Sequence, residues 1–191
     1  MATSTVLKAR AATATKRKAI SRAYADWYAE MGVTHELTIS LGIHPKRFDP
    51  ETEFMPQLKR IARRIGRDVR GLSKRQVATP APTQLPWMAG FYEAKDNAGA
   101  LFPHWHGVIA LNPGEELPLR MSLLEHVGKD ATRDAGIFAP LCDRTIIATP
   151  KAKPTFHLIT LTTAEDYISY ARKQGFYNET THWTLEDILA C

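Results

Sequence analysis

The chain has 191 residues, of which 44% are hydrophobic and 24% are charged. Those proportions are typical of a globular domain and exclude a fully disordered, collagen-like or coiled-coil chain. Two cysteines are too few for a disulfide framework. No apolar run reaches the roughly 18 residues of a membrane span, and the N-terminus lacks the apolar segment of a secretory signal. We therefore expect no membrane association and a reducing, cytoplasmic environment.

The net formal charge of +5 is unevenly distributed. Residues 1–30 contain six Lys or Arg and two carboxylates, and residues 56–76 contain eight Lys or Arg and one carboxylate. Such a concentrated basic surface suits a polyphosphate partner. A solvated basic helix face is the simpler alternative for either segment.

The first half of the chain predicts a helix, a strand and a second helix. Residues 1–31 are expected to form a basic arm and a basic helix, which Gly32 ends. The segment 34–43 alternates apolar and polar residues, which predicts a half-buried strand. Apolar residues recur at steps of three and four in 52–74, which predicts a helix with one apolar stripe and a basic opposite face. The Pro-rich segment 76–86 predicts a loop.

The second half predicts a hairpin followed by further strands and helices. The expected elements are strands over 87–95 and 104–111, a helix over 115–130, strands over 143–149 and 155–161, and a helix from Thr162 or Thr163 to near Gly175. This order predicts an α+β fold, with a central antiparallel sheet of about five strands and helices packed on it. We expect one domain over 32–178 and a short C-terminal tail over 179–191.

His104 and His106 flank Trp105 on the second strand of the hairpin. Residues i and i+2 of a strand share a face, so the two imidazoles can converge on one ion. Glu93 lies on the preceding strand, and the hairpin can bring it beside the pair. Two imidazoles and one carboxylate leave coordination positions open, which suits a catalytic divalent ion. Asp96, in the loop, is the competing carboxylate.

Tyr170 and Lys173 share one face of the last predicted helix, with Tyr167 three residues earlier. A nearby ammonium favours the phenolate form of a tyrosine, and a metal ion on a phosphate makes the phosphorus a better electrophile. The pattern therefore suits covalent attack on a phosphodiester. The simpler alternative is a pair of half-buried aromatic residues on an amphipathic helix.

Three segments resemble the motifs of one family, the HUH-superfamily rolling-circle replication initiators (Rep endonuclease domains). THELTISL resembles the first motif, FPHWHGVIAL the His-apolar-His motif, and YARKQG the Tyr-x-x-Lys-x-Gly motif. They occur in the family's order and span about 34–175. The resemblance implies a ferredoxin/RRM-like HUH fold. It also implies metal-dependent nicking and joining of single-stranded DNA, at a sequence- or hairpin-specific site, to initiate rolling-circle replication.

The resemblance also implies roles for individual residues. His104, His106 and Glu93 would hold Mg²⁺ or Mn²⁺, and Tyr170 would form a 5′-phosphotyrosine with Lys173 beside it. Tyr167 is a possible second nucleophile. The residues expected to contact the DNA backbone are Lys16, Arg17, Lys18, Lys59, Arg60, Arg63, Arg64, Arg67 and Arg70.

The expected partners are single-stranded DNA or an origin hairpin, together with a separate helicase. The compartment would be the bacterial cytoplasm for a plasmid or phage protein, or the host-cell nucleus for a eukaryotic viral one. Three alternatives stay open: a single-tyrosine HUH transposase, a non-catalytic nucleic-acid-binding module that stacks bases on aromatic residues, and a zinc-dependent hydrolase with water as nucleophile.

Overall fold

The computed structural model describes residues 18–40, 54–95, 101–130, 155–163, 166 and 181–190. Its strands are β1 (His35–Ser40), β2 (Met88–Lys95), β3 (Leu101–Ile109), β4 (Lys129–Asp130), β5 (Thr155–Thr160) and β6 (Thr181–Thr184). They form one sheet in the order β4-β5-β1-β3-β2-β6. The five strands β5, β1, β3, β2 and β6 pair with their neighbours in antiparallel fashion. The two-residue strand β4 pairs in parallel with β5 at one edge of the sheet. The predicted α+β class with an antiparallel sheet of five strands is confirmed, apart from this additional edge strand.

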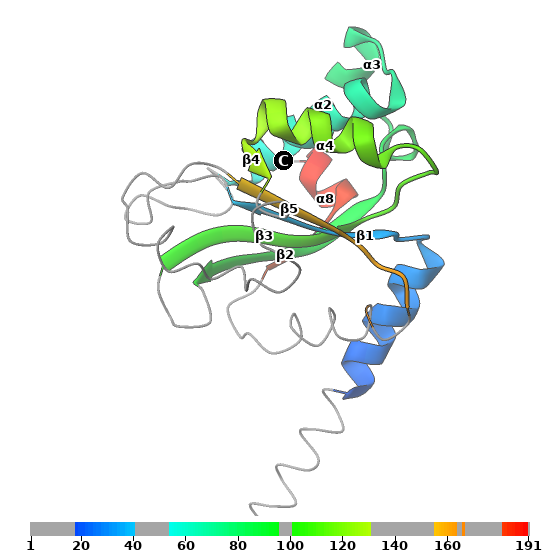
Figure 1. The fold of residues 1–191 in the computed structure, drawn as a ribbon, viewed down its shortest axis with the longest axis vertical. Coiled ribbons are helices and arrows are strands. Elements are labelled where there is room, and N and C mark those ends of the chain that lie inside the picture. The colour runs from blue at the N-terminus through cyan, green and yellow to red at the C-terminus, as the bar shows by residue number, and fades with distance from the viewer. Residues whose placement is uncertain are drawn as a thin grey trace, which may run out of the picture.

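The helices are α2 (Met55–Arg70), α3 (Lys74–Ala78), the 3-10 turn η3 (Pro82–Gln84), α4 (Glu116–His126) and α8 (Leu185–Ala190). Residues 18–30 are also helical. Figure 1 shows α2, α3, α4 and α8 on one side of the sheet, with the helix of 18–30 extending to the other side. Within the described part of the chain, no helix has the length and apolarity to cross a membrane.

The main core lies between the sheet and the helical layer. Leu37 and Ile39 of β1 and Trp105 of β3 project into it, and all three are fully buried. From α2, the stripe predicted by the sequence packs onto them, with Leu58 and Ile65 almost completely covered. Burying one such side chain contributes about 1.5–3 kcal/mol, so this stripe fixes α2 on the sheet.

The indole of Trp105 fits over a glycine on its own strand. A Cβ atom at Gly107 would overlap the Trp105 ring, and one at its cross-strand partner Gly90 would overlap the backbone of β3. The absence of side chains at this pair therefore leaves the space that the indole fills.

The opposite face of the sheet is also covered, contrary to the half-buried strand predicted for 34–43. All six residues of β1 are buried, including Glu36, Thr38 and Ser40, whose positions alternate with the core residues. A second apolar cluster, which contains Tyr28 and Val108, joins the helix of 18–30 to this face. The polar positions of β1 therefore lie inside the molecule, where polar groups need partners.

The helix predicted over 52–74 ends four residues early. Gly71 adopts a left-handed conformation (φ 65°) that ends α2. Ser73 then starts α3 with a capping box to Gln76, in a segment that was partly expected to be loop. Leu72 still packs against the main core although it lies outside the helix, which explains why the apolar stripe continues through it.

The hairpin prediction is confirmed, with β3 starting three residues before the expected strand. The helix expected from Thr162 or Thr163 lies almost wholly outside the described residues. At its expected start, Thr163 and Asp166 form a capping box in which each backbone N–H donates to the other residue's side chain. The strand expected over 143–149 lies outside the described residues. In the segment expected as a C-terminal tail, β6 pairs with β2, and α8 buries Leu185 and Ile188 in the main core.

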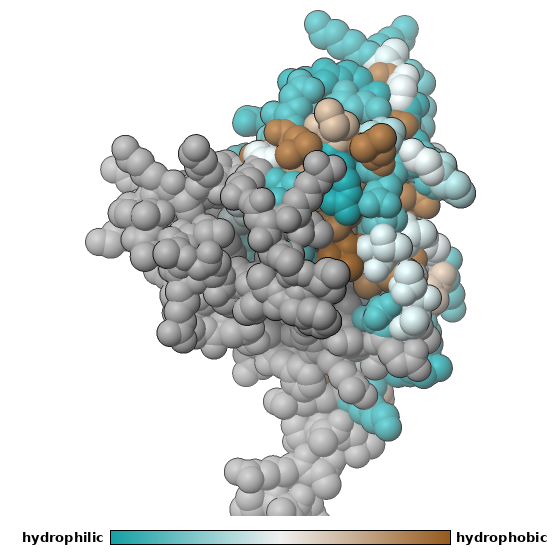
Figure 2. Space-filling view, in the orientation of Figure 1, coloured by the Kyte–Doolittle hydropathy of each residue, from teal (hydrophilic) through white to brown (hydrophobic). Residues whose placement is uncertain are grey.

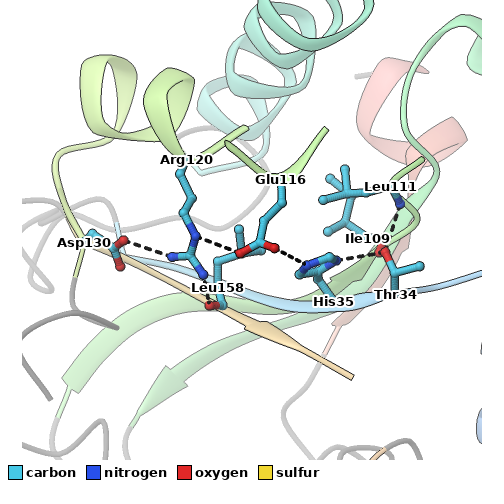
Figure 3. A network of polar contacts seen from close by, with 8 residues as sticks. All are labelled: Thr34, His35, Ile109, Leu111, Glu116, Arg120, Asp130 and Leu158. Atoms are coloured by element: carbon cyan, nitrogen blue, oxygen red, sulfur yellow. Dashed lines mark hydrogen bonds and ion pairs between the residues drawn. The ribbon is translucent and has the colours of Figure 1, made fainter. Parts of the chain in front are cut away.

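A polar network attaches α4 to the sheet (Figure 3). His35 Nε2 lies 3.5 Å from a Glu116 carboxylate oxygen, and Nδ1 lies 2.8 Å from the Thr34 hydroxyl. Arg120 Nε donates to Glu116, and its two Nη groups donate to the Asp130 carboxylate and the Leu158 carbonyl. One guanidinium thus joins α4, β4 and β5, and the burial of His35 lowers the pKa of its imidazole, against the opposing effect of Glu116.

This network predicts a loss of stability at mildly acidic pH. A histidine has an unperturbed pKa of about 6.5, so unfolded His35 takes up a proton that the folded protein binds only at lower pH. The free energy of unfolding should therefore fall as pH drops from about 6.5 toward the lowered pKa of folded His35, by up to about 1.4 kcal/mol per pH unit. Denaturant unfolding between pH 7.5 and 5 should show a weaker pH dependence for His35→Gln than for the wild type. Parallel curves for the two proteins would show that His35 titrates normally in the fold.

Candidate functional site

His104 and His106 lie on the face of the sheet opposite the helical layer. Trp105, between them, is fully buried in the core under the helices, and neighbouring strand residues point to opposite faces. His104 is only 4% exposed. The two imidazole ring centroids are 4.5 Å apart, with the ring planes at 80°. The sequence prediction that the two rings share a face is therefore confirmed.

The position of the His106 ring is set by the neighbouring strand. Thr38 of β1 is the register partner of His106, and its hydroxyl oxygen lies 2.8 Å from His106 Nδ1. When Nδ1 carries the proton, its N–H donates a hydrogen bond to the hydroxyl oxygen, and Nε2 is then the nitrogen whose lone pair a metal ion would bind. Histidines that bind metal ions usually have their other nitrogen held in this way.

Glu93 occupies the register position directly opposite His104 on β2. Directly opposed residues of antiparallel strands have Cβ atoms about 5 Å apart. The side chains of Glu93 and Asp96 lie outside the described part of the structure. Among the residues whose side chains are described, no group of three His, Cys, Asp or Glu converges as a metal site.

The available donors fit a divalent cation. An imidazole nitrogen binds such an ion at about 2.0–2.2 Å, a distance that two rings with centroids 4.5 Å apart can both reach. A carboxylate at the register position of Glu93 would complete a mixed nitrogen and oxygen set with open positions, which suits a catalytic divalent ion better than a closed structural zinc site.

Two further histidines lie in the same row across the sheet. The register aligns His157 with Thr38 on one side of His106, and Phe91 with His182 on the other. The sequence motifs include neither histidine: the alternation in β5 could have indicated the face of His157, whereas β6 is too short to give such a signal for His182.

His182 belongs to an aromatic group on this face. Its ring centroid lies 4.7 Å from that of Phe91 and 5.6 Å from those of Tyr24 and Trp27 on the helix of 18–30. Burial lowers the pKa of His182, which favours a neutral imidazole among the aromatic rings. The candidate face therefore combines imidazoles with aromatic side chains.

The basic residues of α2 lie elsewhere. Arg60, Arg63, Arg64 and Arg67 line a groove of about 760 Å³ between α2 and α3. Because α2 packs against the Trp105 side of the sheet, this groove and the His pair lie on opposite sides of it. The predicted metal ligands and the predicted DNA-binding arginines of α2 are thus not brought together.

The other predicted site residues are placed as follows. Arg70 forms an ion pair with Glu115 at 2.9 Å, and neither it nor Lys59 lines the groove. Lys18 is exposed at the start of the described N-terminal helix. The predicted residues outside the described part of the structure are Lys16, Arg17, Tyr167, Tyr170 and Lys173.

Comparisons with protein families, with curated proteins and with solved structures find no match to this chain.

Proposed function

We propose that this protein nicks and rejoins single-stranded DNA in a metal-dependent reaction with Tyr170 as the nucleophile. The observation that carries the proposal is the register of three strands, in which Glu93 opposes His104 while Thr38 opposes His106 and contacts its Nδ1. A non-catalytic binding module has no need for this combination of residues.

In this proposal, His104, His106 and Glu93 hold Mg²⁺ or Mn²⁺ against the scissile phosphate. The ion, when bound, would withdraw electron density from a non-bridging phosphate oxygen and stabilise the charge that develops there. Thr38 would hold the His106 ring in place through Nδ1 while Nε2 bound the ion, and the buried position of His104 would limit its motion. The protein residues therefore supply a preorganised phosphate site.

The Tyr170 oxygen attacks phosphorus, and the bond from phosphorus to the 3′ oxygen breaks. The tyrosine proton passes to solvent, and the departing 3′ oxygen takes up a proton to become a free hydroxyl. The product is a 5′-phosphotyrosine, in which a tyrosyl ester replaces the broken 3′ ester. Attack by another 3′ hydroxyl can therefore reverse the step and join strands. Lys173 would orient the phosphate or stabilise the phenolate, and Tyr167 is available as a second nucleophile.

The biological role that suits this chemistry is the initiation of rolling-circle replication, with an origin hairpin as substrate and a separate helicase. The antiparallel sheet with the His pair on a central strand supports an HUH-type arrangement. The basic N-terminal helix would add contacts to the DNA backbone.

The nucleophile predicts the outcome of a covalent trapping experiment. Incubation with Mn²⁺ and a pool of labelled single-stranded oligonucleotides that contain stem-loops should give a protein–DNA band on a denaturing gel. Tyr170→Phe should abolish the band because the variant lacks the attacking oxygen, while the matched Tyr167→Phe variant should retain it. A band that survives only in Tyr170→Phe would assign attack to Tyr167, and cleavage without any adduct would favour a metal hydrolase instead.

The contact between Thr38 and His106 predicts a metal-binding defect that can be measured without DNA. Thr38→Val keeps the shape of this buried side chain but removes the hydroxyl, so Mn²⁺ affinity should fall about 10–100-fold. Isothermal titration of the purified protein with Mn²⁺ measures the effect, with Thr38→Ser as the variant that restores the hydroxyl. Equal affinities for all three proteins, at matched thermal stability, would remove His106 from the proposed metal site.

A further inference from the structure

We infer that the groove between α2 and α3 binds the phosphate backbone of a double-stranded nucleic acid. The proposed function requires a single strand at the face that carries His104 and His106. The groove lies on the other side of the sheet, so it would hold a different segment of nucleic acid. This inference extends the proposed function but does not require the nicking reaction.

The charge of the groove is its first supporting feature. Four arginines and one lysine line it, Arg60, Arg63, Arg64, Arg67 and Lys74, and none of the described lining residues is a carboxylate. Arg67 is paired with Asp68 at 2.6 Å. The other four cations form no ion pair with any residue that the structure describes. Their charge is therefore available to an anionic partner.

Arg63 provides a second, independent feature. Its Nε atom is buried and has no hydrogen-bond partner within the described structure. A buried N–H of a guanidinium without an acceptor is costly, and a phosphate oxygen in the groove would satisfy it. Arg63 is one of the residues that line the groove, so a phosphate bound there could supply the missing acceptor.

The spacing along α2 suits consecutive phosphates. Arg60 and Arg67 are separated by seven positions of one helix, which corresponds to about 10 Å along the axis at 1.5 Å per residue. Phosphates of one strand of duplex DNA recur about every 3.4 Å along its axis, so the row can contact several of them. The left-handed Gly71 and the capping box at Ser73 turn the chain so that α3 brings Lys74 to the same groove.

The lining residues favour a duplex over a single strand. Proteins that bind single strands stack exposed bases on aromatic side chains, and the lining that the structure describes contains no Phe, Tyr or Trp. A duplex keeps its bases stacked inside and presents phosphates, which Arg and Lys recognise. The aromatic group of Tyr24, Trp27 and Phe91 instead lies on the face that carries the His pair.

The test compares binding of a short labelled duplex and a labelled oligothymidine of the same length, by fluorescence anisotropy in EDTA at several salt concentrations. Arg60→Gln/Arg64→Gln should weaken duplex binding at least about tenfold and reduce the slope of log K against log salt by about 1.8. The charge-matched control compares two single variants: Arg64→Gln in the groove, and Arg75→Gln at an exposed α3 residue outside it, which should alter duplex affinity less than about twofold.

A charge-preserving variant tests the geometry of the groove. Arg63→Lys keeps the positive charge but removes the planar guanidinium and its buried Nε donor. Duplex affinity should fall several-fold while the salt slope stays unchanged. An unchanged affinity for Arg63→Lys, or equal losses for Arg64→Gln and Arg75→Gln, would overturn the inference. So would a loss of oligothymidine binding as large as the loss of duplex binding.

The result is separable from that of the proposed function. Duplex binding is measured without divalent metal, and adduct formation on single-stranded oligonucleotides is measured with it. Duplex binding that depends on the groove, in a protein that forms no adduct, would support the groove and reject the nicking reaction. If the wild type forms the adduct and the groove variants bind duplex normally, the nicking reaction would be supported and the groove rejected.

Discussion

The alternation of side chains along β3 is the constraint on which the rest of the structure depends. Trp105 is completely buried beneath the helical layer, and its indole occupies the space over Gly107 and Gly90. Because strand neighbours point to opposite faces, burial of Trp105 requires His104 and His106 to project from the other face. A shift of β3 by one residue would place two imidazoles in the apolar core and the indole outside it, so the packing energy of Trp105 fixes the register of the candidate site.

The sheet consequently separates two surfaces of different chemistry. One carries two imidazoles and the register position of Glu93, which suit a metal ion, beside an aromatic group that packs between the sheet and the helix of 18–30. The other supports α2, whose apolar stripe is buried and whose arginines face a groove shared with α3. The exterior of the helical layer is largely hydrophilic, with apolar side chains gathered over α4 (Figure 2), where Leu117 and Met121 are exposed. A nucleic acid bound to both surfaces must present two segments to the protein.

Residue patterns within single elements could be read from the sequence, whereas partners from other elements could not. The alternation in His104–Trp105–His106 and the stripe of α2 are local and were predicted. The contact between Thr38 and His106, which are 68 positions apart in the chain, depends on the pairing of β1 with β3. Likewise, only packing distinguishes Arg70, which pairs with Glu115, from the groove arginines of the same helix. β6 and α8 have four and six residues, too few for a periodic signal. They are held in the fold by the burial of Trp183 and Leu185 in the main core.

The central claim is that one divalent ion binds to the imidazoles of His104 and His106. Pulsed electron paramagnetic resonance of the Mn²⁺-loaded protein reports directly on nitrogen ligands. The account predicts couplings from two histidine nitrogens, reduced to one in either His104→Gln or His106→Gln. A spectrum without histidine nitrogen couplings, or one that both substitutions leave unchanged, would contradict it.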